Sequence, residues 1–222
     1  MNHASLPETR REYIHVGSTP ASMRARVSDR EAQSLSLEYR LALMDYYELF
    51  SLEVSFVIDR SDLQARYRDM QRAMHPDRFV SAGDQERRIA MQKSTQINEA
   101  FRILNDPMER ARYLLELGGY AWSDEASTTR DSAFLIEQME LREAISAVRD
   151  ADEPFDALGH IMDVIIKALM AYEQELVVLF SGDTKETMGN IADIIKKMQF
   201  FRRLEQEGFE LEAELEDIEA GA

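Results

Sequence analysis

Residues 71–79 read Gln71-Arg72-Ala73-Met74-His75-Pro76-Asp77-Arg78-Phe79. Apolar residues recur at helical spacing before this stretch. The pattern stops at the proline, whose ring cannot continue a helix and which disfavours the α conformation for the preceding residue. A second helical pattern begins near Asp84. The sequence therefore predicts two antiparallel helices joined by a stiff, exposed His-Pro-Asp loop.

The helix before the loop is predicted to have an apolar face and a basic face. The apolar residues are spaced by four, three and four positions, as on one side of a helix: Leu63, Tyr67, Met70 and Met74. Arg68 and Arg72 lie on the opposite face, where residues four apart are neighbours. Together with Arg78 beyond the loop, they indicate a basic strip that meets an acidic partner. The alternative is two solvated arginines.

The composition favours an all-α protein. The 222 residues include only nine glycines and five prolines, and 45% of them are hydrophobic. The formal net charge of −16 argues against nucleic acid as a partner. No apolar run approaches the roughly 20 residues that a bilayer span requires, so we expect no membrane association and a cytoplasmic location.

Signatures of enzymes and metal sites are missing from the sequence. The chain has no cysteine, which excludes disulfides and thiolate metal ligands. Its four histidines are scattered, and none has a second ligand at metal-binding spacing. We found no glycine-rich phosphate loop and no nucleophile elbow. The sequence therefore predicts neither an enzyme nor a bound metal or cofactor.

The first 43 residues lack apolar periodicity and mix arginine with serine. One interpretation is a disordered extension, or a start placed too far upstream, with Met44 as the true start. The other is an organellar transit peptide, which would place the protein in the mitochondrial matrix, although carboxylates such as Glu8 and Glu12 are unusual for one. An apolar segment typical of secretory signals is absent.

Proline and glycine residues divide the sequence after residue 43 into two helical units. Pro107 starts a short helix, which Gly118 and Gly119 end. We therefore predict one unit over residues 44–117, a linker over 118–130, and a three-helix unit over 131–219.

The first helix of the second unit, expected over residues 131–149, carries two apolar stripes. Phe134, Leu141, Ile145 and Val148 fall on one face. Leu135, Ile136 and Met139 fall on the opposite face, beside three charged residues, Glu140, Arg142 and Glu143. An exposed apolar patch with a charged rim is typical of a binding surface. The alternative is a helix buried in the middle of the domain.

The last two helices are expected to complete the bundle. Apolar residues at heptad spacing predict a helix over 154–180, and the next helix starts near Thr184. Ile191, Ile195 and Met198 should form its core face, while Phe200 points the other way. Phe200 is then either a lone surface residue or part of the exposed patch. The acidic tail over 205–219 is expected to be a solvated helix end.

A helix, a His-Pro-Asp loop and a second helix resemble the J-domain, the co-chaperone module that stimulates the ATPase of chaperones of the DnaK/HscA type. Five segments are together similar to the HscB family of iron–sulfur co-chaperones: residues 44–50, 71–79, 96–100, 110–115 and 130–143. The last of these, Arg-Asp-Ser-Ala-Phe-Leu-Ile-Glu-Gln-Met-Glu-Leu-Arg-Glu, is similar to the family's hallmark segment. The resemblance covers roughly residues 44–215.

The resemblance implies a fold, two partners and two sets of site residues. Family members have an L-shaped arrangement of a J-domain helical hairpin and a C-terminal three-helix bundle. They bring the scaffold protein IscU to the chaperone HscA and stimulate its ATPase. The chaperone contact maps to His75, Pro76 and Asp77. The scaffold contact maps to seven residues: Leu135, Ile136, Met139, Glu140, Arg142, Glu143 and Phe200. The cysteine module of some eukaryotic members is absent, which argues for a bacterial-type protein.

Two rival interpretations remain open. One is a general J-protein that serves unfolded clients, although a Gly/Phe-rich linker is missing. The other is a helical adaptor in which His-Pro-Asp is a coincidence. Nothing in the sequence demands more than a monomer.

Overall fold

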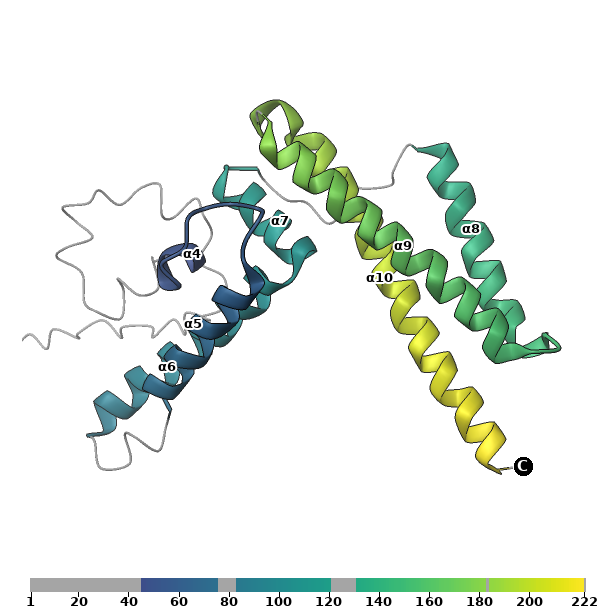
Figure 1. Cartoon of the computed structure of the whole chain (residues 1–222), viewed down its shortest axis with the longest axis horizontal. Helices are drawn as coiled ribbons and strands as arrows, with labels where there is room; N and C mark the ends of the chain where they lie inside the picture. The colour runs from purple at the N-terminus through teal and green to yellow at the C-terminus, as the bar shows by residue number, and fades with distance from the viewer. Residues whose placement is uncertain (1–44, 76–82, 121–130, 183, 222) are drawn as a thin grey trace, which may run out of the picture. The chain divides into compact units, whose positions relative to one another are not determined.

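The computed structural model describes residues 45–75, 83–120, 131–182 and 184–221, and within these ranges all regular structure is helical (Figure 1). The all-α prediction is confirmed. The predicted N-terminal extension, the loop residues Pro76, Asp77 and Arg78, and residues 121–130 of the predicted linker lie outside the described residues. Among the described helices, none is long and apolar enough to cross a membrane.

Three of the four N-terminal helices begin at an aspartate that caps them. The four helices are α4 (Tyr46–Leu49), α5 (Arg60–Ala73), α6 (Asp84–Asn105) and α7 (Pro107–Leu117). Asp45, Asp59 and Asp106 precede α4, α5 and α7, and their carboxylates accept bonds from backbone N–H groups of the first turn. Such caps satisfy donors that have no partner within the helix. These aspartates therefore fix where α4, α5 and α7 begin.

The core between α4, α5, α6 and α7 follows the predicted apolar faces. Its fully buried side chains include Tyr47, Leu63, Ile97 and Leu104. The remaining predicted core residues of α5, including Tyr67, are partly buried and pack against this cluster. The two long helices α5 and α6 thus meet along one continuous apolar seam.

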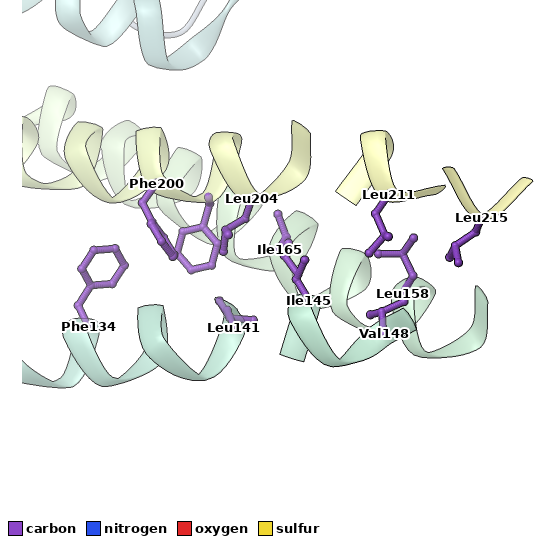
Figure 2. Close-up of a cluster of buried hydrophobic side chains, with 11 residues drawn as sticks. Phe134, Leu141, Ile145, Val148, Leu158, Ile165, Phe200, Leu204, Leu211 and Leu215 are labelled. Atoms are coloured by element: carbon purple, nitrogen blue, oxygen red, sulfur yellow. The ribbon is translucent and has the colours of Figure 1, made fainter. Parts of the chain in front are cut away.

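The C-terminal helices are α8 (Ser132–Ala147), the 3₁₀ turn η2 (Val148–Asp150), α9 (Pro154–Ser181) and α10 (Thr184–Gly221). Helices α9 and α10 run side by side, and α8 packs against both of them (Figure 1). Figure 2 shows the shared core, in which residues of α8 and η2 face residues of α9 and α10. All four residues of the predicted core stripe are buried: Phe134, Leu141, Ile145 and Val148.

Helix α10 changes neighbours along its length. Its first half, with Ile191, Ile195 and Met198, is buried in a cluster that includes Ala111 and Leu115 of α7. From Phe200 onward, its buried residues join the core that contains α8. Arg202, near the change, forms an ion pair of 2.6 Å with Asp106 at the start of α7.

This change of neighbours corrects two predictions. Phe200 is only 3% exposed and lies in the core beside Leu204, so the expectation that it points away from the core is wrong (Figure 2). Leu211 and Leu215 are also buried, so the acidic tail is not wholly a solvated helix end. Helical periodicity placed Phe200 opposite Ile195 correctly, but the opposite face of α10 is covered by α8.

Candidate partner-binding surfaces

The N-terminal end of α8 is anchored to α10 through one aspartate. Asp131 Oδ1 accepts a bond from the Phe134 backbone N–H at 3.1 Å, and Asp131 Oδ2 lies 2.8 Å from Lys197 Nζ. The Lys197 ammonium also lies 5.3 Å from the centre of the Phe134 ring. The hydrogen bond from Lys197, followed by that from the Phe134 N–H, lowers the pKa of the Asp131 carboxyl. The helix therefore starts at a fixed place on the bundle.

The outer face of α8 exposes apolar side chains. The exposed fractions are 38% for Leu135, 58% for Ile136 and 64% for Met139. Three charged side chains on the same helix are also exposed, namely Glu140, Arg142 and Glu143. We call these six residues the α8 surface. Their exposure excludes the alternative of a helix buried in the middle of the domain and leaves an apolar patch with a charged rim.

Phe200 lies beneath the α8 surface. Its ring makes an edge contact with Phe134, with the ring centres 5.6 Å apart. The Arg142 guanidinium carbon lies 5.6 Å from the centre of the Phe200 ring. Of the seven residues that the resemblance assigned to the scaffold contact, six are therefore exposed, and the seventh supports Arg142 from below.

Of the residues in the predicted chaperone contact, the structure describes those on α5 and His75. Arg68 and Arg72 are exposed on α5, and Arg72 forms an ion pair of 2.8 Å with Asp69 one turn away. His75 is exposed directly after the end of α5. The roles of Arg68, Arg72 and the loop residues remain predictions.

Two buried residues that lie beside each other near α9 were missed from the sequence. Phe56 is buried and stacks on Phe180 of α9, with the ring centres 4.9 Å apart. The buried Arg110 lies with its guanidinium carbon 5.0 Å from the Phe56 ring centre, donates to the Leu104 carbonyl, and has its pKa lowered by burial. A phenylalanine within the connector over 53–58 was the available signal. Among the described residues, no three His, Asp or Glu side chains gather in a group that could hold a metal ion.

Comparisons with known proteins agree with the two groups of helices. A model of the DnaJ domain matches residues 45–113, and a model of the HSCB C-terminal oligomerisation domain matches residues 130–207. A co-chaperone protein HscB homolog of Shewanella loihica is 36% identical over 164 residues, which are 74% of this chain and 95% of that protein. The chain belongs to the HscB family. A homolog from Shewanella pealeana is 37% identical over the same length.

Solved structures of HscB proteins share the fold. Chaperone HscB from Vibrio cholerae superposes with a TM-score of 0.67 at 35% identity, over 78% of this chain and 99% of that one. Human co-chaperone protein HscB gives a TM-score of 0.69 at 27% identity, over 76% and 82% of the two chains. The predicted combination of a J-domain and a C-terminal helical domain is confirmed. Helix α5 lies within the DnaJ match of this HscB-family chain, and α8 lies within the C-terminal match.

Proposed function

We propose that this HscB-family protein is a two-site adaptor rather than an enzyme. The α8 surface binds an IscU-type iron–sulfur scaffold, and the His-Pro-Asp loop with the basic face of α5 engages an HscA-type ATPase chaperone and stimulates it. The exposure of Leu135, Ile136 and Met139 on one face of α8, beside three exposed charged residues, is the observation that carries this proposal. The proposed units are residues 44–117 for the chaperone and 131–219 for the scaffold.

The α8 surface has the composition of a protein contact. Burying Ile136 and Met139 under a partner would contribute about 1.5–3 kcal/mol for each side chain before the costs of association. Glu140, Arg142 and Glu143 carry charges of both signs around these side chains and would fix the orientation of the scaffold. Because the chain has no cysteine, the thiolate ligands of the cluster belong to the scaffold, which carries the cluster as cargo.

The loop offers a complementary chemistry to the chaperone. The Asp77 carboxylate can accept a bidentate pair of hydrogen bonds from an arginine of the ATPase. Such charge-assisted bonds are stronger than hydrogen bonds between neutral groups. Arg68, Arg72 and Arg78 would meet acidic groups around it. Stimulation requires that these contacts favour the hydrolysis-competent conformation of the chaperone over the resting one.

An adaptor with both sites in one chain brings the scaffold close to the chaperone. A scaffold bound to α8 is held near any chaperone bound to the loop, which raises its effective concentration there. Helices α7, α9 and α10 share a buried cluster, which supports a mechanical link between the helices that carry the proposed sites. One copy carries both sites, so we expect the monomer to be active.

The test is the ATPase rate of an HscA-type chaperone with this protein and an IscU-type scaffold, added singly and together. We expect stimulation that is greater with both than with either alone. Asp77→Asn should abolish the stimulation and keep scaffold binding. Asp163→Asn, which removes an exposed carboxylate of α9 paired with Lys167 at 3.4 Å, is the matched control and should behave as the unchanged chain.

Two other outcomes would support the rival interpretations. If the ATPase stimulation is the same with and without the scaffold, and the protein captures mixed unfolded chains, it would be a general J-protein. An unaltered ATPase rate would indicate a helical adaptor without chaperone activity, and would contradict the proposal.

A further inference from the structure

Three polar side chains join α5 to α6 close to the end of α5. The Tyr67 hydroxyl donates to Asn98 Oδ1 at 3.1 Å, and Gln71 Nε2 donates to the same oxygen at 3.0 Å. Gln71 Nε2 also donates to the Tyr67 hydroxyl oxygen at 2.5 Å. The Tyr67 ring stacks on Phe101 of α6, with ring centres 4.0 Å apart. A single acceptor on α6 thus receives two donors from α5.

These bonds lie where the orientation of α5 affects the loop most. Gln71 is one turn before His75, at the last turn of the helix. Elsewhere the two helices meet through apolar side chains such as Leu63 and Ile97, whose attraction has no direction. One further hydrogen bond, from the Arg60 guanidinium to the Asn105 carbonyl at 2.9 Å, lies at the other end of α5, far from the loop. Hydrogen bonds are directional, so the shared oxygen of Asn98 fixes both the register and the rotation of the end of α5.

The network is better suited to positioning than to stability. Gln71 and Asn98 are exposed, and water competes for the hydrogen-bonding groups of exposed side chains. The apolar residues beneath them already hold the two helices together. Losing the network should therefore leave the fold intact and release only the direction of the helix end.

We propose that Tyr67, Gln71 and Asn98 are positioning residues that set the direction in which α5 presents His75 and the following loop to the ATPase chaperone. They act through the loop and need not touch the chaperone. This role rests on the proposed function, because it matters only if the loop stimulates the ATPase.

Two substitutions at Asn98 distinguish loss of the hydrogen-bond acceptor from a change in side-chain size. Asn98→Leu removes the acceptor and keeps a side chain of similar size. Asn98→Asp keeps an oxygen that can accept from both Tyr67 and Gln71, and it should rescue the function. Tyr67→Phe removes the hydroxyl and retains the ring that stacks on Phe101.

A matched control tests whether any exposed glutamine would have the same effect. Gln206 on α10 also makes a side-chain bond within its own helix, to Glu210 Oε1 at 2.9 Å. Gln206→Ala should leave the ATPase stimulation unchanged, and Gln71→Ala should lower it.

The measurement is the ATPase rate of an HscA-type chaperone over a range of concentrations of the full chain. We expect Asn98→Leu and Tyr67→Phe to lower the maximal stimulation about fivefold, the factor that corresponds to about 1 kcal/mol. The melting temperature and the affinity for an IscU-type scaffold should not change. A merely structural role would leave fewer folded molecules, which raises the concentration needed but keeps the same maximum.

The outcomes distinguish the two proposals. If the unchanged chain stimulates the ATPase and Asn98→Leu reaches the same maximum, the positioning role is wrong and the proposed function stands. A maximum that falls equally in Asn98→Asp would also overturn the positioning role. If the unchanged chain gives no stimulation, the proposed function fails, and the positioning role fails with it.

Discussion

Helices α8 and α10 each carry apolar residues on two faces, yet only α8 exposes its second set. Met139 of α8 is 64% exposed, whereas Phe200 of α10 is 3% exposed. Helix α8 packs on α9 and α10 from one side, and α10 packs on α7, α8 and α9. A second apolar stripe therefore stays exposed on a helix at the edge of a bundle, where no described helix covers the outer face.

The same comparison can be made within α10. The α10 residues that pack with α7 end at Met198, and those that pack with α8 begin at Phe200. A long helix that passes from one neighbour to another uses different faces in turn. Phe200 already packs with α8, although it lies only two positions after Met198, which packs with α7.

The largest effect should come from truncating Phe200, the buried residue in the comparison of α10 with α8. Phe200→Ala should lower the free energy of unfolding by about 3–5 kcal/mol, since it removes a ring from a packed core and leaves a cavity. Phe209→Ala is the matched control on the same helix, because Phe209 is about half exposed. Its cost should stay within about 1 kcal/mol. Denaturant unfolding would measure both, and equal losses would contradict the placement of Phe200 in the core.

Truncating Met139, the exposed residue in the same comparison, should weaken binding and leave stability almost unchanged. Met139→Ala should weaken binding of an IscU-type scaffold by about 2 kcal/mol, or about 30-fold, as expected for a side chain at the centre of a contact. Its effect on the free energy of unfolding should stay within about 0.5 kcal/mol. Met170→Ala on α9 is the control, because Met170 has a similar exposure of 63%. Titration calorimetry would measure the affinities, and an equal loss in both variants would refute a site on α8.

A smaller effect should come from the residue that anchors α8 to α10. Asp131→Ala removes the cap of α8 and the partner of Lys197, and should lower the free energy of unfolding by less than Phe200→Ala does. Asp131→Asn keeps a capping oxygen and loses only the charge, so its loss should be smaller. Denaturant unfolding at neutral pH would rank the variants.

The pH dependence of this effect follows from the direction of the pKa shift. Because folding lowers the pKa of Asp131, its ionised form contributes stability that is fully present above the unfolded pKa of about 3.9. That contribution is lost as the pH falls through the lower, folded pKa. The original chain and Asp131→Asn should therefore differ at pH 7 and converge below about pH 4. A constant difference down to pH 2 would show that the charge of Asp131 does not act in this way.

Local signals in the sequence predicted most of the helices correctly. The spacing of Phe134, Leu141 and Ile145 was enough to predict α8 and its buried face. Pro107 and Gly118 marked the ends of α7. Capping and helical periodicity depend on neighbours in the sequence, which explains why these features could be predicted.

The errors concern features that depend on contacts between distant segments. Burial of Phe200 requires α8 to lie beside α10, and burial of Leu211 and Leu215 requires the same core to extend along the acidic tail. Phe56 stacks on a residue of α9 more than 100 positions away. The network of Tyr67, Gln71 and Asn98 likewise depends on the register between α5 and α6. Periodicity within one segment contains no information on which segment covers it.

Methionine methyl groups offer the most direct test that α8 is the scaffold-binding edge of the bundle. Met91, Met139 and Met170 have nearly equal exposures of 59%, 64% and 63%, and they lie on α6, α8 and α9. We would record NMR spectra of the full chain with ¹³C-labelled methionine methyl groups during titration with an IscU-type scaffold. The signal of Met139 should shift or broaden, and those of Met91 and Met170 should not. A response at Met170 or Met91 with an unchanged Met139 signal would contradict the account.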